Sequence, residues 1–482
     1  MNLKLTILIA KQFWTYTLKS KPVYVMLFVI CILLAYAMYS GWQSYVIQNE
    51  IRTHYQHQAR ESWENNPDKH PHRMAHFGSF AFRLKHPLSI FDFGMESFTG
   101  NAVFLEAHKQ NTVNFSEASF STGLLRFGEI SMAMLLQTLI PLIIFFIGFA
   151  SIAAERESGT LKIMLTQGAS WKDILFGKSL GMLGLSLLLF IPVFVILFLW
   201  LWLSNSIVFT NDEWWRYMGI VGAYFFFFQV ICTISILVSA SSKTSKDALI
   251  KLLAMWLVFV VLLPKTTQAF GNYLYPSPSK VEFDSKMEKE LVLKGDSHNP
   301  DDSHYKALKD SVLQAHNVSS VKDLPFNYGG FVMREGEKNS SEIYNRHLNE
   351  LLQTYRQQNS VSRYTAFINP YIAVKNISMA LSGTDFQSYV SFQEQAEAYR
   401  YKLAQKMNEL QMEFVSNDAT SSAGKSNSIS KKHWVEFPDF EYQFFSVSTA
   451  VQSEISSIIA LAIWTLASSG FIIIFSKKVK TI

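Results

Sequence analysis

The chain has 482 residues, of which 49% are hydrophobic and 17% charged, and its formal net charge is +5. The apolar residues are concentrated in runs of about 20, the length that a helix needs to cross a hydrocarbon core. This distribution excludes an assembly of ordinary soluble domains. The basic excess lies in short segments next to these runs, so it does not indicate a nucleic-acid-binding surface.

The first 21 residues mix apolar and basic side chains at helical spacing. The stretch is too polar to cross a membrane, and Pro22 marks its end. We therefore expect a short helix that lies along the inner membrane surface. A cytosolic extension of the first span is the alternative.

Six apolar runs predict six transmembrane helices, of which the fifth is the shortest. Their expected bounds are residues 22–47, 129–153, 179–204, 217–240, 247–264 and 454–476. Long hydrophilic insertions, residues 48–128 and 265–453, follow the first and fifth spans. The predicted fold is an all-α polytopic membrane protein with an interfacial helix and two mainly helical extracytoplasmic insertions.

The distribution of Lys and Arg predicts the orientation. Residues 1–21, 154–178, 241–251 and the C-terminal tail together hold fourteen basic residues and four acidic ones. Short segments with such a basic excess stay in the cytosol. Both termini are thus expected in the cytosol, and a bacterial inner (cytoplasmic) membrane fits best. The two cysteines, Cys31 and Cys232, fall inside spans, so no disulfide is expected between the exposed regions.

The first insertion holds seven of the twelve histidines. The run NPDKHPHRMAHFG contains His70, His72 and His76, and the last two would share one face of a helix, as some metal sites require. Pro71 disrupts the preceding turn, and no cysteine or tight carboxylate cluster completes a ligand set. No metal site is therefore expected, with these three histidines as the candidates if one exists.

The second insertion contains two apolar stripes at helical spacing. One runs from Phe392 to Phe414, and the other runs from Tyr344 to Tyr355. We expect two long helices that pack as an antiparallel pair outside the membrane.

Motifs for nucleotide binding and hydrolysis are absent. Gly177, Lys178 and Ser179 resemble the end of a phosphate-binding loop, but Lys172 stands where that motif needs a glycine. Neither GxSxG nor HExxH occurs. The chain is not expected to be an enzyme or to need a cofactor, and any energy from ATP must come from another chain.

The segment between the second and third spans, residues 154–178, has an unusual pattern of charges and glycines for a membrane protein. Gly159 permits a tight reversal, and Thr160 can cap the helix that follows. That helix offers apolar anchors at Leu161, Ile163, Met164 and Leu165. We expect a short cytosolic helix that receives mechanical work from a separate ATPase; an ordinary loop is the alternative.

Several residues of this segment resemble the coupling helix of ABC-2-type exporter permeases: Glu155, Glu157, Gly159, Thr160, Leu161, Leu165, Gly168 and Lys178. The resemblance covers nearly the whole chain. It points to a subfamily with two large extracytoplasmic insertions, one of which contains a domain of unknown function. Further matching stretches are NPDKHPHRMAHFGSFAF, GNAVFLEAHKQN, YPSPS, NPYIAVKNISMALSGTDF and FQEQAEAYR.

The resemblance implies a type V ABC exporter-like fold and the membrane subunit of an ABC exporter. ABC ATPase subunits would bind the ATP and dock on the coupling helix. A second permease subunit would pair with this one through spans one, two and five, and membrane lipid would surround both. A periplasmic partner is a further expectation. The alternative function is a membrane-anchored binding or assembly protein whose helical extracytoplasmic domain recognises a partner.

Overall fold

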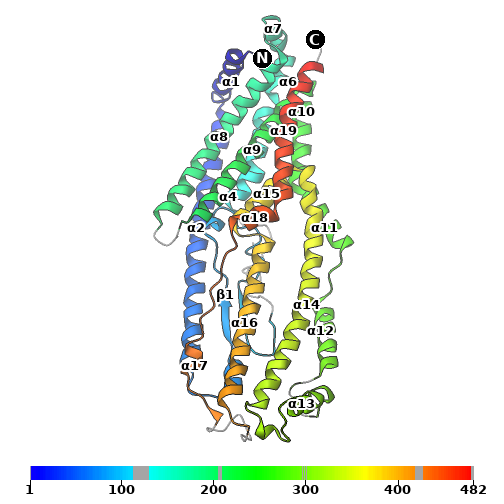
Figure 1. The fold of residues 1–482 in the computed structure, drawn as a ribbon. Coiled ribbons are helices and arrows are strands. Elements are labelled where there is room, and N and C mark those ends of the chain that lie inside the picture. Colours follow the sequence, from blue (N-terminus) through cyan, green and yellow to red (C-terminus); the bar gives the residue numbers. More distant parts are fainter. Residues whose placement is uncertain are drawn as a thin grey trace.

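The computed structural model describes residues 2–111, 130–204, 209–295, 297, 299, 301–417 and 427–478. Six of its helices are long and apolar enough to cross a membrane, which confirms the six predicted spans at that level. These segments are Lys21–Glu64, Met132–Glu157, Trp171–Leu203, Asn211–Ser241, Ser245–Leu274 and Ile455–Lys477. They form a bundle at one end of an elongated molecule, and the insertions extend from its other end (Figure 1).

The N-terminal stretch forms a separate helix, α1 (Leu3–Thr17), which packs along the third span, α8 (Trp171–Leu203). Small residues allow the close approach. A Cβ on Gly177 would lie 2.8 Å from the carbonyl oxygen of Thr6, and one on Gly181 would lie 3.0 Å from that of Ala10. Trp14 Nε1 donates a 2.6 Å hydrogen bond to the Gly181 carbonyl oxygen, which adds a polar contact to the same interface.

The first span continues far beyond its apolar part. Helix α2 (Lys21–Glu64) has 44 residues, which corresponds to roughly 66 Å, about twice the thickness of a hydrocarbon core. Its second half therefore forms a stalk for the first insertion, and the chain enters that insertion as a helix.

The remaining spans pack around the fourth span, α9 (Asn211–Ser241), which lies at the centre of the bundle. Two of them contain π-helical turns immediately before a proline, where the regular bonding ladder is broken. The second span comprises α4 (Met132–Met134), η4 (Leu135–Leu139), α5 (Ile140–Gly148) and α6 (Ala150–Glu157). The fifth comprises α10 (Ser245–Trp256), η5 (Leu257–Leu262) and α11 (Leu263–Leu274), and the sixth is α19 (Ile455–Lys478).

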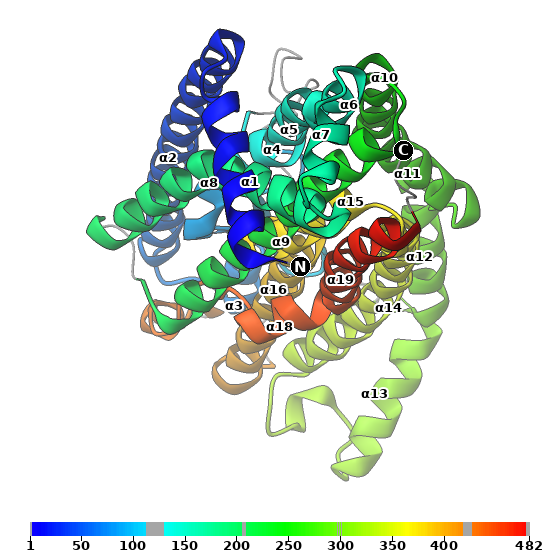
Figure 2. The same ribbon diagram turned by 90° about the horizontal axis from the view of Figure 1, so that it is seen from above.

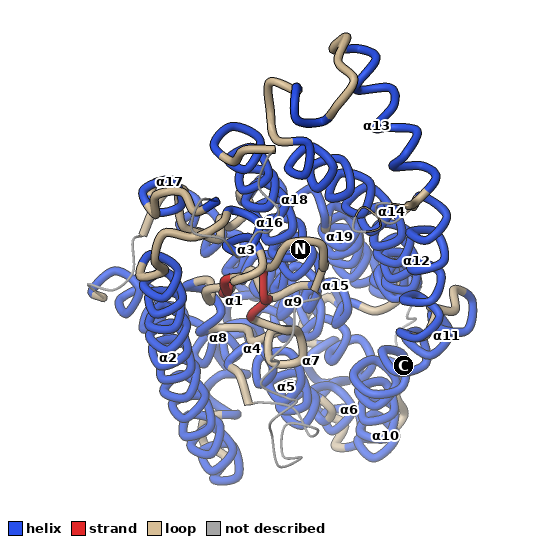
Figure 3. Tube along the Cα trace, turned by 90° about the horizontal axis from the view of Figure 1, so that it is seen from below, coloured by secondary structure: helices blue, strands red, loops and turns tan. Residues whose placement is uncertain are grey.

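Beyond α2, the described part of the first insertion is mostly loop and strand, which the sequence analysis did not predict. It contains α3 (Pro71–Ala75), β1 (Ser79–Phe82), η1 (Pro87–Ile90) and β2 (Ala102–Leu105). The strands pair antiparallel with Ser79 opposite Leu105, and they are the only strands in Figure 3. Their buried side chains Ala81, Val103 and Leu105 pack against Phe392 of the second insertion, so the two insertions share a core.

The second insertion is helical, as predicted, and its two longest helices lie antiparallel. Asn327, at the start of α14, binds Gln411 near the end of α16, whereas Tyr355, late in α14, contacts Phe386 at the start of α16. The helices are α12 (Lys280–Lys294), α13 (Ser303–Ala315), η6 (Val321–Asp323), α14 (Tyr328–Tyr364), η7 (Thr365–Phe367), α15 (Pro370–Ser382), α16 (Phe386–Phe414), α17 (Lys432–Val435) and α18 (Val447–Ser453).

Helix α15 joins the insertions to the bundle. It packs against α9 and α19. Ser378 on α15 donates a 2.5 Å hydrogen bond to Asp92 of the first insertion and lies 3.1 Å from the hydroxyl of Tyr224 on α9. Tyr224 in turn accepts a 2.6 Å hydrogen bond from Gln137 of the second span. A buried polar chain therefore connects both insertions to two of the spans.

Candidate functional site

The predicted coupling segment protrudes from the bundle. Helix α6 ends at Glu157, a short helix α7 (Thr160–Thr166) follows, and the chain then enters α8. Helix α7 lies at the end of the molecule that also carries the two termini and is opposite the insertions (Figure 1). The four basic segments of the sequence therefore gather at one end of the bundle.

Two of the predicted site residues form an ion pair. Lys178 Nζ lies 2.6 Å from Glu155 Oε1 and donates a second hydrogen bond to the carbonyl oxygen of Ser151. The Lys178 side chain is 6% exposed, whereas that of Glu155 is 26% exposed. The ring of Phe13, from α1, covers the ammonium at 5.9 Å. The pair joins α6 to α8 and lies where α1 packs.

The next two charged residues attach α6 to the corner between the fourth and fifth spans. Arg156 donates hydrogen bonds to the carbonyl oxygens of Ala240 and Ser242, at the end of α9. Glu157 accepts hydrogen bonds from the backbone N–H and the hydroxyl of Ser245, the first residue of α10. A carboxylate at this position also complements the dipole of α10. Three consecutive side chains thus link α6 to three other helices.

The loops on both sides of α7 depend on glycine. Gly159 has φ +80° and Gly168 has φ +98°, in the left-handed region that other residues rarely adopt. No other group lies within 4 Å of a Cβ built at either position, so the backbone conformation, and not space, selects glycine there. The expected cap is wrong: Gly159 precedes the helix without a side-chain cap, and Thr160 is the first helical residue.

The apolar residues of α7 divide between two faces. Leu161 is fully buried in the core of this chain, so it holds α7 in place and does not face a partner. Met164 and Leu165 are half-buried against the same core. Ile163 is 55% exposed, and the neighbouring Lys162 is exposed as well. Of the four expected anchors, Ile163 is the one that is mainly available at the surface.

Three histidines of the first insertion lie together at the distal end of the molecule. His72 and His76 occupy one face of α3 and its C-terminal cap, and His108 reaches them from the turn after β2. One nitrogen from each ring lies within 4.8 Å of the other two. His70 is not part of this group, because its Nδ1 accepts a hydrogen bond from the backbone N–H of His72 and caps α3.

Neither His108 nor its partner Glu337 stands out as a site residue in the sequence pattern. His108 lies 32 positions beyond His76 and has a left-handed backbone with φ 60°, which is uncommon for a residue other than glycine. Glu337 belongs to the other insertion and is fully buried on α14. The unusual backbone angle is not visible in the sequence, so only the fold reveals this group.

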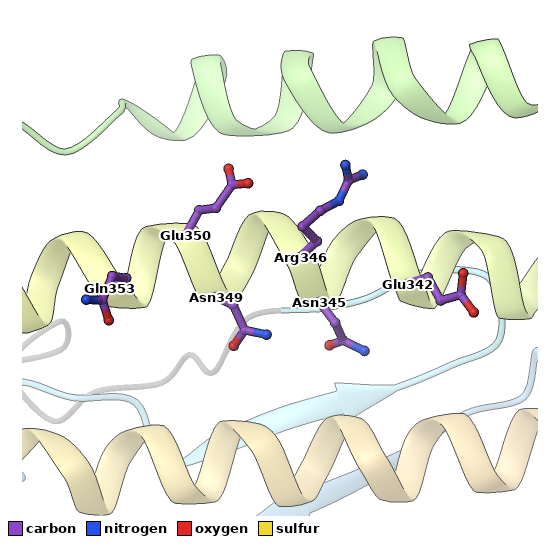
Figure 4. Close-up of a pocket in the computed structure, with 6 residues that line it drawn as sticks. All are labelled: Glu342, Asn345, Arg346, Asn349, Glu350 and Gln353. Carbon is purple, nitrogen blue, oxygen red and sulfur yellow. The ribbon is translucent and has the colours of Figure 1, made fainter.

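A hollow of about 730 Å³ lies along α14. Figure 4 shows that its lining residues project to both sides of this helix, with Arg346 and Glu350 directed toward α12 and Asn345 and Asn349 directed toward α16. Arg346 forms an ion pair with Glu290 of α12. All six lining residues carry polar or charged side chains.

Comparison with known families identifies part of the second insertion. Residues 280–443 match the model of a domain of unknown function (DUF3526). The match begins at the first residue of α12 and includes α14, α15 and α16, but it includes none of the six candidate spans. No curated protein matches the chain. The domain match therefore recognises the exterior helices without assigning them an activity.

Proposed function

We propose that the chain is the membrane-spanning permease subunit of an ABC transporter, and that it works as an exporter. A separate ATPase subunit would bind and hydrolyse the ATP and would dock on α7. The single observation that carries this proposal is the attachment of α7. Glu155, Arg156 and Glu157 fix α6 to α8, α9 and α10, so a force applied to the protruding helix reaches three further helices.

The proposed orientation of the protein in the membrane rests on the basic residues at the end of the bundle that carries α7. Helix α7, both termini and the basic segments lie together there (Figure 1), and the positive-inside rule assigns such an end to the cytosol. We place it in the cytosol of a bacterium, with the protein in the inner membrane and the DUF3526 helices in the periplasm. The ATPase then reaches α7 from the side where ATP is available.

A second permease subunit would complete the transport path. The fifth, sixth and first spans are buried over only 11%, 22% and 28% of their apolar windows, compared with 61% for the second and fourth. Seen from above, α5 lies between α2 and α10 on one side of the bundle (Figure 2). The dimer would form on this side, with lipid covering the remaining apolar surface. The exposed apolar side chains of these spans include Val25, Phe28, Ile32, Phe146, Ile250 and Leu257.

Cross-linking tests this dimer. Phe28→Cys in a Cys31→Ser background is expected to form a disulfide-linked dimer in native membranes, because the two copies of Phe28 would lie near the shared interface. Leu199→Cys, at an apolar position on α8 that is 46% exposed, compared with 67% for Phe28, is the control and should stay monomeric. Equal cross-linking of both variants would contradict the proposed interface.

Substitutions on the exposed side of α7 test whether this helix is the docking surface for the ATPase. Ile163→Asp together with Lys162→Glu is expected to abolish co-purification with the proposed ABC ATPase subunit, while membrane insertion and folding stay normal. Val281→Asp, on the exterior helix α12 and 77% exposed, is the control. Unchanged co-purification of the α7 variant would refute the docking role. Glu155 is unsuitable for this test, because its substitution also breaks an internal ion pair.

The alternative function is a membrane-anchored binding or assembly protein, and the polar hollow along α14 favours it. In that case the exterior helices would bind their partner without an ATPase. Asn345→Trp with Asn349→Trp would fill the hollow. Loss of a periplasmic partner in these variants, together with an ATPase that never co-purifies with the wild type, would support the alternative over the exporter.

A further inference from the structure

The three clustered histidines have the arrangement of a metal-ligand set. The ring centroids of His72 and His76 are 4.6 Å apart, and that of His108 lies 5.4 and 5.3 Å from them. Three neutral imidazoles that converge from two segments form a common ligand set for zinc, which leaves the fourth position open. His72 and His108 are half-buried and His76 is exposed, so an ion can enter from solvent.

A buried carboxylate orients one of the three rings. Glu337 Oε2 lies 3.2 Å from His108 Nδ1 and also accepts a 2.9 Å hydrogen bond from the His108 backbone N–H. Because Nδ1 faces Glu337, the nitrogen left to bind a metal is Nε2. A histidine ligand that donates its other ring N–H to a carboxylate is a recurrent feature of protein metal sites, since it fixes the tautomer and makes the ligand nitrogen more basic.

The carboxylate is itself held in place. Arg400 Nη1 lies 2.7 Å from Glu337 Oε1, and Arg400 binds Glu397 as well. Glu337 and Arg400 are both almost fully buried. The contacts that run from His108 through Glu337 and Arg400 to α16 therefore hold the His108 ring rigidly in place.

We propose that His72, His76 and His108 bind a divalent transition metal, with zinc as the best fit, and that Glu337 supports the site from behind His108. Tetrahedral zinc with bonds of about 2.0–2.1 Å places its ligand nitrogens about 3.4 Å apart. The present nitrogens lie within 4.8 Å of one another, so small rotations of the half-buried His72 and the exposed His76 side chains bring them into range. Imidazole ligands disfavour calcium and magnesium, which take oxygen.

A bound ion would join two segments of the first insertion, each of which contacts the second insertion. His72 and His76 lie on α3 and its C-terminal cap, and α3 packs on α16, whereas His108 is fixed to Glu337 on α14. The metal would therefore stiffen the part of the first insertion that packs on the helices of the DUF3526 domain. The open fourth position would hold water or a donor atom from a ligand. This inference is independent of the proposed function, because it concerns the exterior part of the chain alone.

Zinc binding by the full-length protein in detergent tests the site. The protein should carry a tag without histidine and be treated with chelator before titration with ZnCl₂. The wild type is expected to bind one tightly held zinc ion per chain and to unfold at a higher temperature with zinc than without it. His76→Ala and His108→Ala are each expected to weaken binding at least 100-fold. Co²⁺ in place of zinc should give the visible absorption of a tetrahedral site.

Two controls separate this site from general histidine binding. His57→Ala removes an exposed histidine on α2 and should leave zinc affinity unchanged. Glu337→Gln should lower affinity by about 10–100-fold while all three ligands remain. Equal zinc binding by the wild type and by the triple variant H72A/H76A/H108A would overturn the proposal. A loss in H57A as large as that in H76A would also overturn it.

Discussion

The ammonium of Lys178 and the carboxylate of Glu155 lie 2.6 Å apart, although 23 positions separate them in the chain. Both belong to the segment whose charges stand out in the sequence, and the structure pairs them with each other. Glu155 therefore fixes the base of α7, and the surface offered by α7 is its exposed side at Ile163. This relationship leads to the first prediction.

Removal of the lysine should destabilise the protein more than removal of both charges. Lys178→Ala leaves Glu155 without its cation in a largely buried place and is expected to lower the free energy of unfolding by about 3 kcal/mol. The double variant Lys178→Met with Glu155→Leu should recover most of this loss. Thermal unfolding in detergent measures both, and a double variant less stable than Lys178→Ala would contradict the internal role of the pair.

Glu157 should protect the backbone amides at the beginning of the fifth span from hydrogen exchange. Glu157→Ala removes the acceptor for the Ser245 N–H and hydroxyl, which is expected to cost about 1 kcal/mol locally. Amides in the first turn of α10 should then exchange with deuterium about fivefold faster, as followed by mass spectrometry. Thr166→Ala, an exposed change on α7, should leave their exchange unaltered.

Substitution of the two turn glycines should have the opposite effect to substitution of a helical glycine. Gly159→Ala and Gly168→Ala force alanine into positive φ and should each cost about 1 kcal/mol. Gly222 lies within α9, also with nothing within 4 Å of an added Cβ, and Gly222→Ala should be neutral or stabilising. Melting temperatures in one detergent compare the three, and a loss at all three positions would point to steric effects instead.

Glu96 should give the first insertion a sensitivity to acid. Burial raises the pKa of this carboxyl, but the charges of Lys85, Arg83 and Arg52 outweigh burial and lower it below 4.5. A carboxyl whose pKa is lowered by folding stabilises the folded state at pH values above its ordinary pKa. This stabilisation is lost as the pH falls through the pKa that the group has in the folded state. Arg52 Nη1 lies 3.2 Å from the carboxylate.

Glu96→Gln tests this dependence. The variant should be less stable than the wild type at pH 7, by about 3 kcal/mol, because three cations lose their partner. As the pH falls below the ordinary pKa of a glutamate, the wild type should lose stability more steeply than the variant, so that their difference shrinks. Parallel losses of melting temperature over that range would show that another group controls acid unfolding.

The sequence by itself determined the six spans and the antiparallel pair of exterior helices. Run length measures whether a helix can cross a hydrocarbon core, and apolar spacing shows which face a helix buries. Both properties depend only on residues that are near each other in the sequence, so they can be read without knowledge of the fold. The same local reasoning predicted the reversal at Gly159 but placed the helix cap one residue too late, at Thr160, since the residue types do not fix which residue begins the helix.

Only the tertiary structure decided which side chains meet. Glu155 meets Lys178 because the fold brings the end of α6 within side-chain reach of α8, and Leu161 is buried because α7 packs against α6. His108 joins His72 and His76 because β2 pairs with β1 and places the following turn beside α3. These contacts depend on which distant segments lie next to each other. Burial of the shared core determines that arrangement, and it involves the whole chain at once.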